Sequence, residues 1–128
     1  MKVLMVEPGK IPQEADIEPG LRSLQAAVDG YIQAVYPYED PVALICNEDG
    51  KLMGLPLNRA LRDDTGEIYD IITGNFLITG LDEENFSDLS PELMENIRSN
   101  FWRRSPLCGS AAKSLPSSSR FLHQKIKR

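Results

Sequence analysis

Apolar and polar residues alternate along much of this chain, and the alternation changes period at a few recognisable points. Residues 1–7, Tyr31–Tyr38, Val42–Cys46, Ile68–Thr73 and Phe76–Thr79 are rich in β-branched, aromatic or aliphatic side chains over short runs bounded by turn residues. Such runs predict β-strands. Lys51–Leu57 is the expected return strand of a hairpin after Val42–Cys46, although it contains Gly54 and Pro56.

Two segments have the period of an amphipathic helix. In the first, Leu21–Asp29, apolar residues recur at helical spacing and Gly30 follows the end. In the second, Ser90 can cap the helix that Pro91 opens. Its expected buried face is formed by Leu93, Met94, Ile97 and Phe101. The pattern therefore predicts one α+β domain with a mainly antiparallel sheet and two packed helices.

The connections between these elements are polar. Residues 10–20 and 82–88 are expected to be a connection and an acidic turn, and Gly74-Asn75 suits a tight hairpin or a bulge. Asn58–Arg62 is ambiguous, because it fits either one helical turn or an irregular loop.

The charge distribution divides the chain at residue 102. Residues 1–102 hold all 19 acids and only 7 of the 14 bases, a net charge of −12, whereas residues 103–128 hold the other 7 bases and no acid. We therefore expect an α+β domain over residues 1–102 and a separate basic tail over residues 103–128. The chain has no apolar run long enough to span a bilayer and no secretory leader pattern, so a cytoplasmic location without membrane contact is expected.

The tail has six serines in 26 residues and no sustained periodicity. It is interpretable as a disordered basic arm for an anionic partner, as a terminus without a role, or as a segment translated out of frame. Synonymous codons for residues 103–128 exist that, read two nucleotides later, encode EVALVWKRSKKFTEFKPIPASKNK, whose VALVW run is typical of a strand.

Few side chains are candidates for catalysis. The single histidine, His123, lies in the tail, and the body has one cysteine, Cys46, in an apolar run that predicts a buried free thiol. If the tail is out of frame, the remaining residues provide neither a Ser/His/Asp or Cys/His system nor a zinc site with a histidine ligand. No cofactor is expected.

Several carboxylates are weak candidates for a metal site. Asp63, Asp64 and Glu67 lie close together in the sequence, and oxygen ligands suit Mg²⁺. The alternative is a solvated turn, because aspartate is favoured for backbone reasons in a turn that contains glycine.

Candidate ligand-binding residues are Asn58, Arg59, Arg62, Tyr36 and Tyr38. The arginines belong to an acidic body, where a loop could present them to a phosphate or carboxylate, and tyrosines can stack on bases. The alternatives are an internal salt bridge of Arg59, a helix cap by Asn58, and ordinary packing of the tyrosines.

The string NEDGKLMGLPLNRAL, followed by IYDIITGNFLITG, resembles an uncharacterised family of domains of unknown function. Its members are small proteins of phages and conjugative elements of gut Firmicutes, and the resemblance extends from about Met1 to Phe101. It implies a mobile-element context and a further strand-like segment after the last helix, but no catalytic residues.

These observations lead to three hypotheses of function. The first is a non-enzymatic accessory protein of a mobile element that binds a host protein or a small anionic ligand, for example as an acidic decoy against host defence. The second is a module that sequesters a nucleotide-like signal, and the third is a Mg²⁺-dependent hydrolase. Nucleic acid is not an expected partner of the acidic body, and the oligomeric state stays open.

Overall fold

A computed structural model describes residues 1–83, 85–104, 106 and 124–126 of the chain. The described elements are β1 (Lys2–Val6), β2 (Gln13–Asp16), α1 (Leu21–Val28), β3 (Ile32–Val35), β4 (Val42–Asn47), β5 (Leu57–Arg62), β6 (Ile68–Thr73), β7 (Phe76–Asp82), β8 (Asn85–Ser87), α2 (Pro91–Arg104) and β9 (Gln124–Ile126). The fold confirms the predicted α+β class, with a mostly antiparallel sheet and two helices.

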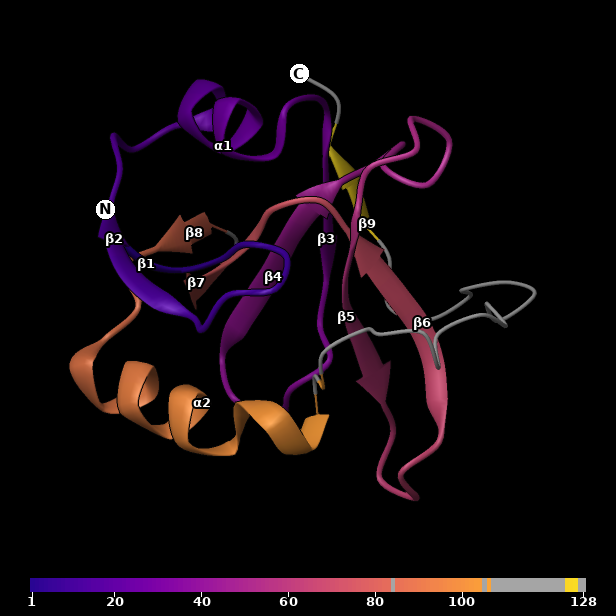
Figure 1. The fold of residues 1–128 in the computed structure, drawn as a ribbon. Coiled ribbons are helices and arrows are strands. Elements are labelled where there is room, and N and C mark those ends of the chain that lie inside the picture. Colours follow the sequence, from indigo (N-terminus) through magenta and orange to yellow (C-terminus); the bar gives the residue numbers. More distant parts are fainter. Residues whose placement is uncertain (84, 105, 107–123, 127–128) are drawn as a thin grey trace.

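The main sheet has the strand order β2-β1-β7-β4-β3-β9, and β8 adds to β7 (Figure 1). Its strand pairs are antiparallel. The central strand, β7, places Ile78 opposite Leu4 of β1 and opposite Leu44 of β4. One apolar row thus joins three strands that are distant in the sequence.

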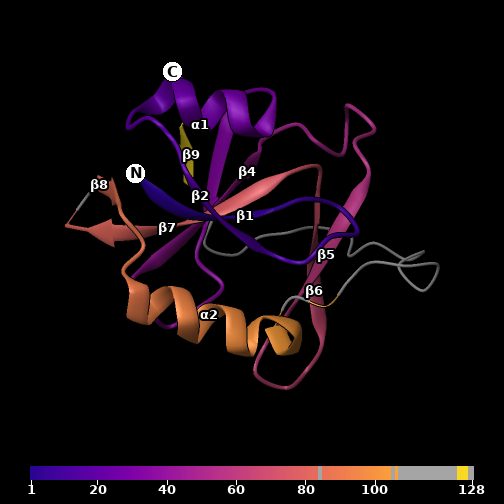
Figure 2. The ribbon, with the colours of Figure 1, turned by 60° about the vertical axis from the view of Figure 1, so that its left-hand side comes forward.

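The main sheet is covered on both faces (Figure 2). On one face, Ala43, Ile45 and Leu77 pack with Leu24 and Val28 of α1. On the other face, a separate two-stranded sheet of β5 and β6 packs together with α2. Because successive side chains of a strand point to opposite faces, β4 and β7 are buried on both sides and carry apolar residues at consecutive positions.

The core on the face covered by α2 contains Leu44 and Ile78 from the main sheet, Leu61 and Ile72 from the β5–β6 ribbon, and Phe101 from α2. Full burial of an aliphatic or phenyl side chain contributes roughly 1.5–3 kcal/mol. The ribbon and α2 are therefore held to the sheet by ordinary hydrophobic packing.

The predicted hairpin between Val42–Cys46 and Lys51–Leu57 is wrong. Both edges of β4 are occupied, by β3 and by β7, and residues 48–54 form turns before β5 begins at Leu57. Gly54 takes a left-handed φ of 73°, and Pro56 has no N–H to donate, so this segment is unsuited to a sheet ladder. Asn58–Arg62 is correspondingly part of a strand and neither a helical turn nor a loop.

The hairpin expected at Gly74-Asn75 is also wrong. The strands before and after it belong to different sheets, since β6 pairs with β5 whereas β7 pairs with β1, β4 and β8. Gly74 has a φ of 74°, and it redirects the chain from the ribbon into the main sheet. The sequence pattern identified both strands but not their partners.

Both helices are confirmed. The first turn of α2 is capped by Ser90, whose Oγ accepts a hydrogen bond from the Leu93 amide at 3.2 Å. α1 ends at Asp29, which is left-handed with a φ of 64°. The connections expected at residues 10–20 and 82–88 contain the short strands β2 and β8. None of the described helices is long and apolar enough to cross a membrane.

Within the basic tail, α2 extends to Arg104 and β9 pairs antiparallel with β3. Residues 105, 107–123 and 127–128 of the predicted tail, which include His123, lie outside the described residues.

Candidate functional site

The largest fully buried side chain among the described residues is that of Arg59, one of the predicted ligand-binding residues. It is completely buried, and its guanidinium donates hydrogen bonds to Asn58 Oδ1 at 2.8 Å and to the Lys10 carbonyl at 2.5 Å. The guanidinium also lies 5.4 Å from the centroid of the Phe101 ring. Arg59 thereby joins the β1–β2 loop, β5 and α2, which no local sequence pattern indicates.

Asn58 extends the same network. Its Nδ2 donates to the Val6 carbonyl at 3.0 Å and to the Gly74 carbonyl at 2.7 Å, and its side chain is completely buried. Asn58 caps no helix, and Arg59 forms these contacts with neutral acceptors and a ring. Ligand binding by the pair stays a prediction, but a ligand would have to displace these contacts to reach either side chain.

The other predicted ligand-binding residues do not converge with this pair. Tyr36 packs against the core on the α1 face of the main sheet, whereas Tyr38 packs against the core on the α2 face. Partial burial raises the pKa of the Tyr36 hydroxyl. Arg62, at the end of β5, is half-buried. Two tyrosines on opposite faces of a sheet cannot form one stacking platform.

The weak metal candidates belong to a turn. Asp63 Oδ1 accepts hydrogen bonds from the Thr65 amide at 2.9 Å, the Thr65 hydroxyl at 2.7 Å and the Glu67 amide at 3.0 Å. These hydrogen bonds lower the pKa of the Asp63 carboxyl, and the bond from the Thr65 hydroxyl has the largest effect. Among the described residues, no three His, Cys, Asp or Glu side chains are grouped to hold a metal ion. The geometry is that of an Asx turn.

Cys46 is a buried free thiol, as the sequence predicts. Its Sγ lies 3.7 Å from the Gln33 carbonyl, and burial raises the pKa of the thiol to about 12. Because the thiolate is the nucleophilic form, this cysteine is inert at neutral pH.

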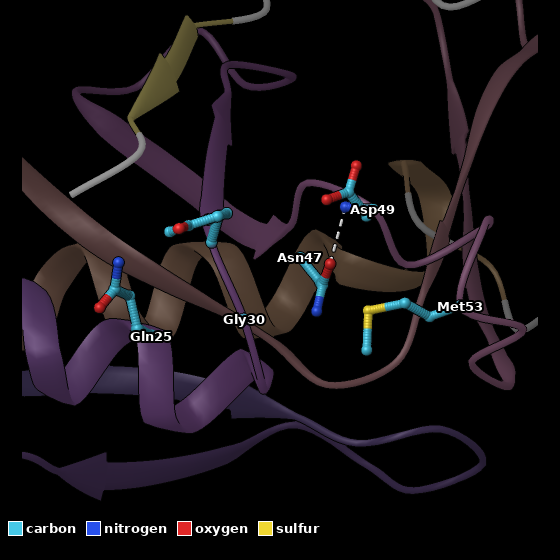
Figure 3. A pocket seen from close by; sticks show the side chains of 6 residues that line it. Gln25, Gly30, Asn47, Asp49 and Met53 are labelled. Atoms are coloured by element: carbon cyan, nitrogen blue, oxygen red, sulfur yellow. Dashed lines mark hydrogen bonds between the residues drawn. The ribbon is translucent and has the colours of Figure 1, made fainter.

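A pocket that the sequence did not predict lies between the end of α1 and the turn after β4 (Figure 3). Its volume is about 270 Å³, and we call it the α1 pocket. Its lining residues are Gln25 of α1, Gly30 and Tyr31 before β3, Asn47 at the end of β4, and Asp49 and Met53 of the following turn. In Figure 3, Gln25 and Met53 lie on opposite sides with Asn47 between them.

The floor of the α1 pocket is built around Asn47. Its Nδ2 donates to the Val28 carbonyl at 2.9 Å and to the Asp29 carbonyl at 3.2 Å, and its Oδ1 accepts from the Asp49 amide at 2.7 Å. Asn47 therefore satisfies carbonyls at the end of α1 and fixes the turn after β4. Gly30 is required for this approach, because a Cβ there would lie 2.8 Å from Asn47 Nδ2.

The described surface has a large excess of carboxylates. Thirteen acidic residues are exposed, against five basic residues: Lys2, Lys10, Arg22, Lys51 and Arg98. All of these bases except Arg22 are in ion pairs with acids of the same chain, namely Lys2–Asp16, Lys10–Glu7, Lys51–Asp70 and Arg98–Glu14. Most of the exposed negative charge is thus not neutralised by described bases.

Negative charge gathers where β4 and β7 meet α2, at the exposed Asp82 and Glu92 and the half-buried Asp40, which we call the acidic edge. The β4–β7 register and the hydrogen bond from the Leu81 amide to the Pro41 carbonyl place Asp40 beside Asp82. Asn96 of α2 donates to Asp40 Oδ2 at 3.2 Å, and Glu92 lies one turn before Asn96 on the same helix face. Within the described part of the chain, none of the three is in an ion pair.

The α1 pocket and the acidic edge both depend on contacts between residues that are distant in the sequence, which is why the sequence analysis missed them. The only local signals were Gly30 directly after a helix and the Asn-Glu-Asp-Gly turn at residues 47–50. These signals predict turns and give no indication that the two turns meet.

Comparison with protein families gives one match. The family described as Domain of unknown function (DUF3846) matches residues 1–101, which include α1, β1–β8 and most of α2. No curated protein and no solved structure matches the chain.

Proposed function

Starting from the fact that the chain belongs to the DUF3846 family of domains of unknown function, we propose that it is a non-enzymatic binding protein. Its acidic surface engages a basic partner protein. The single observation that supports this function most is the excess of exposed carboxylates, since four of the five exposed described bases already pair with acids of the same chain.

The arrangement of the charges favours a partner over an internal role. Asp40 lies just before β4 and Asp82 at the end of β7, next to the same register pair, so their like charges repel one another modestly in the isolated protein. A basic partner at the acidic edge would relieve that repulsion. Complementary charge also speeds association, and the effect falls with salt because the Debye length is only about 8 Å at physiological ionic strength.

The candidate groups for chemistry support binding over catalysis. Asp63 is engaged by the backbone of its own turn, and Cys46 is buried with a raised pKa. Mg²⁺-dependent hydrolysis and sequestration of a nucleotide-like signal remain alternatives that no described contact favours. Among the described residues that line the α1 pocket, the charged one is Asp49, which disfavours an anionic ligand.

The partner we favour is a basic nucleic-acid-binding protein of a bacterial host. Such proteins carry positive surfaces that recognise phosphates, and an acidic protein can occupy the same surface. This role as a decoy fits the mobile-element context that the sequence resemblance implies. The genes that lie next to those of other family members test the mobile-element context independently. Chromosomal housekeeping genes as the usual neighbours would contradict it.

Affinity capture from a lysate of a gut Firmicute tests the proposed function. The test protein carries Asp40→Asn, Asp82→Asn and Glu92→Gln, and the control carries Glu18→Gln, Asp64→Asn and Glu67→Gln, which remove the same charge elsewhere on the surface. We expect wild type and control to retain the same basic protein at low salt and to release it at high salt. Capture that is unaffected by salt, or equal for both variants, would contradict the proposal.

A further inference from the structure

The α1 pocket has a chemical character that the proposed function does not assign. We propose that it receives an arginine side chain, which in the cell belongs to the basic partner. That the arginine belongs to the basic partner rests on the proposed function, whereas recognition of the guanidinium rests on the α1 pocket alone.

The electrostatics of the α1 pocket favour a cation. Asn47 Nδ2 contacts the Val28 and Asp29 carbonyls, so the pocket lies at the C-terminal end of α1, where the helix dipole is negative. The carboxylate of Asp49 adds a full charge, and no described lysine or arginine lines the pocket. A phosphate or carboxylate ligand would be repelled.

The size and lining select a side chain with a flat cationic end. Sites for drug-sized ligands occupy about 300–1,000 Å³, so a pocket of about 270 Å³ suits one side chain. Tyr31 offers an aromatic ring, and Met53 a polarizable thioether. A guanidinium can stack on an aromatic ring and bind a carboxylate in the same plane, which an ammonium cannot do as well.

The side chains that would bind are not those that hold the local fold. Tyr31 accepts a hydrogen bond from the Glu48 amide through its backbone carbonyl, and Asp49 contacts Asn47 and Met53 through its backbone amide and carbonyl. The Tyr31 and Met53 residues are about half exposed, at 53% and 52%. Substitutions at Tyr31 and Asp49 can therefore test recognition without unfolding the protein.

The direct test is an NMR titration of the full chain with N-acetyl-arginine amide. Matched titrations use the neutral isostere N-acetyl-citrulline amide and N-acetyl-lysine amide. We expect saturable shifts at Tyr31, Asp49 and the Met53 methyl with a dissociation constant on the order of 1 mM for the arginine compound. The citrulline compound should produce no saturable shift, and the lysine compound should bind more weakly.

Variants provide the second arm. Asp49→Asn and Tyr31→Leu should each weaken binding, Asp49→Asn by on the order of tenfold, whereas Asp64→Asn should leave it unchanged. Equal responses to arginine and citrulline, tighter binding of lysine, or full binding by Asp49→Asn would overturn the proposal. If capture of a basic protein depends on salt but the arginine compound does not bind, the inference about the α1 pocket is contradicted and the proposed function is not. If the arginine compound binds but no basic protein is captured in a salt-dependent way, the proposed function is contradicted and the inference about the α1 pocket is not.

Discussion

The guanidinium of Arg59 lies over the ring of Phe101, 5.4 Å from its centroid, although the two residues are 42 positions apart in the sequence. This contact links the ribbon strand β5 to α2 inside the core on the α2 face. With the hydrogen bonds to Asn58 Oδ1 and to the Lys10 carbonyl, it provides favourable contacts for the completely buried guanidinium.

Replacing Arg59 with methionine should lower the free energy of unfolding substantially. The Lys10 carbonyl and Asn58 Oδ1 would lose their donors, and a buried polar group left without a partner costs about 1–3 kcal/mol. Urea unfolding followed by circular dichroism measures the loss. A double-mutant cycle with Phe101→Leu should give a coupling of about 1–2 kcal/mol, and zero coupling would show that the stacking contributes nothing.

A second substitution, Arg59→Lys, separates the structural role of Arg59 from the predicted ligand-binding role. The network predicts that Arg59→Lys also destabilises the protein, because one ammonium lacks the planar fork that reaches both acceptors. Unchanged stability together with lost binding of an anionic ligand would instead support the ligand-binding prediction.

Gly30→Ala should destabilise the end of α1. The new Cβ would lie 2.8 Å from Asn47 Nδ2 and would push the amide away from the Val28 and Asp29 carbonyls. We expect a loss of about 1–3 kcal/mol in urea unfolding, and a similar loss for Asn47→Ala. If the two losses are additive in the double variant, the two residues do not act through the same contact.

The pH dependence of stability should contain a contribution from Cys46. Burial raises the pKa of this thiol from 9.0 to about 12, so between these values the unfolded chain loses a proton that the folded protein retains. Stability should therefore fall as the pH rises from 9 to 12, by at most about 1.4 kcal/mol per pH unit. Other groups titrate in the same range, so the measurement is the difference in slope between wild type and Cys46→Ala. An identical slope in both proteins would contradict the contribution.

A chain that ends at Pro106 should fold. The buried apolar residues of both described cores lie between Val3 and Phe101, and the described contact that is lost is the short pairing of β9 with β3. We expect a native circular dichroism spectrum and a Tm within a few degrees of that of the full chain. Loss of cooperative unfolding would show that residues 107–128 are part of the domain, against the division expected from charge.

Local features of the fold were predictable from the sequence, whereas long-range ones were not. The helix cap at Ser90 and the buried thiol of Cys46 follow from neighbouring residues, and both are confirmed. The partners of β4 and β6 were mispredicted because turn glycines indicate that a chain turns but not which strand it meets. The positive φ of Gly74 is compatible both with a tight hairpin and with a turn that leads from one sheet to another.

The candidate sites show the same limit. Arg59 was predicted to bind a ligand because a loop in an acidic body could present it to an anion, but it lies on a strand and its burial depends on Lys10 and Phe101, which lie far away in the sequence. The α1 pocket requires Gly30 and Asn47 to meet across 17 positions. The overall negative charge was readable from composition, but its gathering at Asp40, Asp82 and Glu92 needs the strand register.

The rate constant for association with the captured basic protein, measured against ionic strength, tests the central claim most directly. The account predicts that this rate constant falls steeply as salt rises for wild type. The triple variant at Asp40, Asp82 and Glu92 should associate about tenfold more slowly at low salt, and the control triple variant like wild type. A rate constant that is independent of salt, or that both triple variants lower equally, would contradict it.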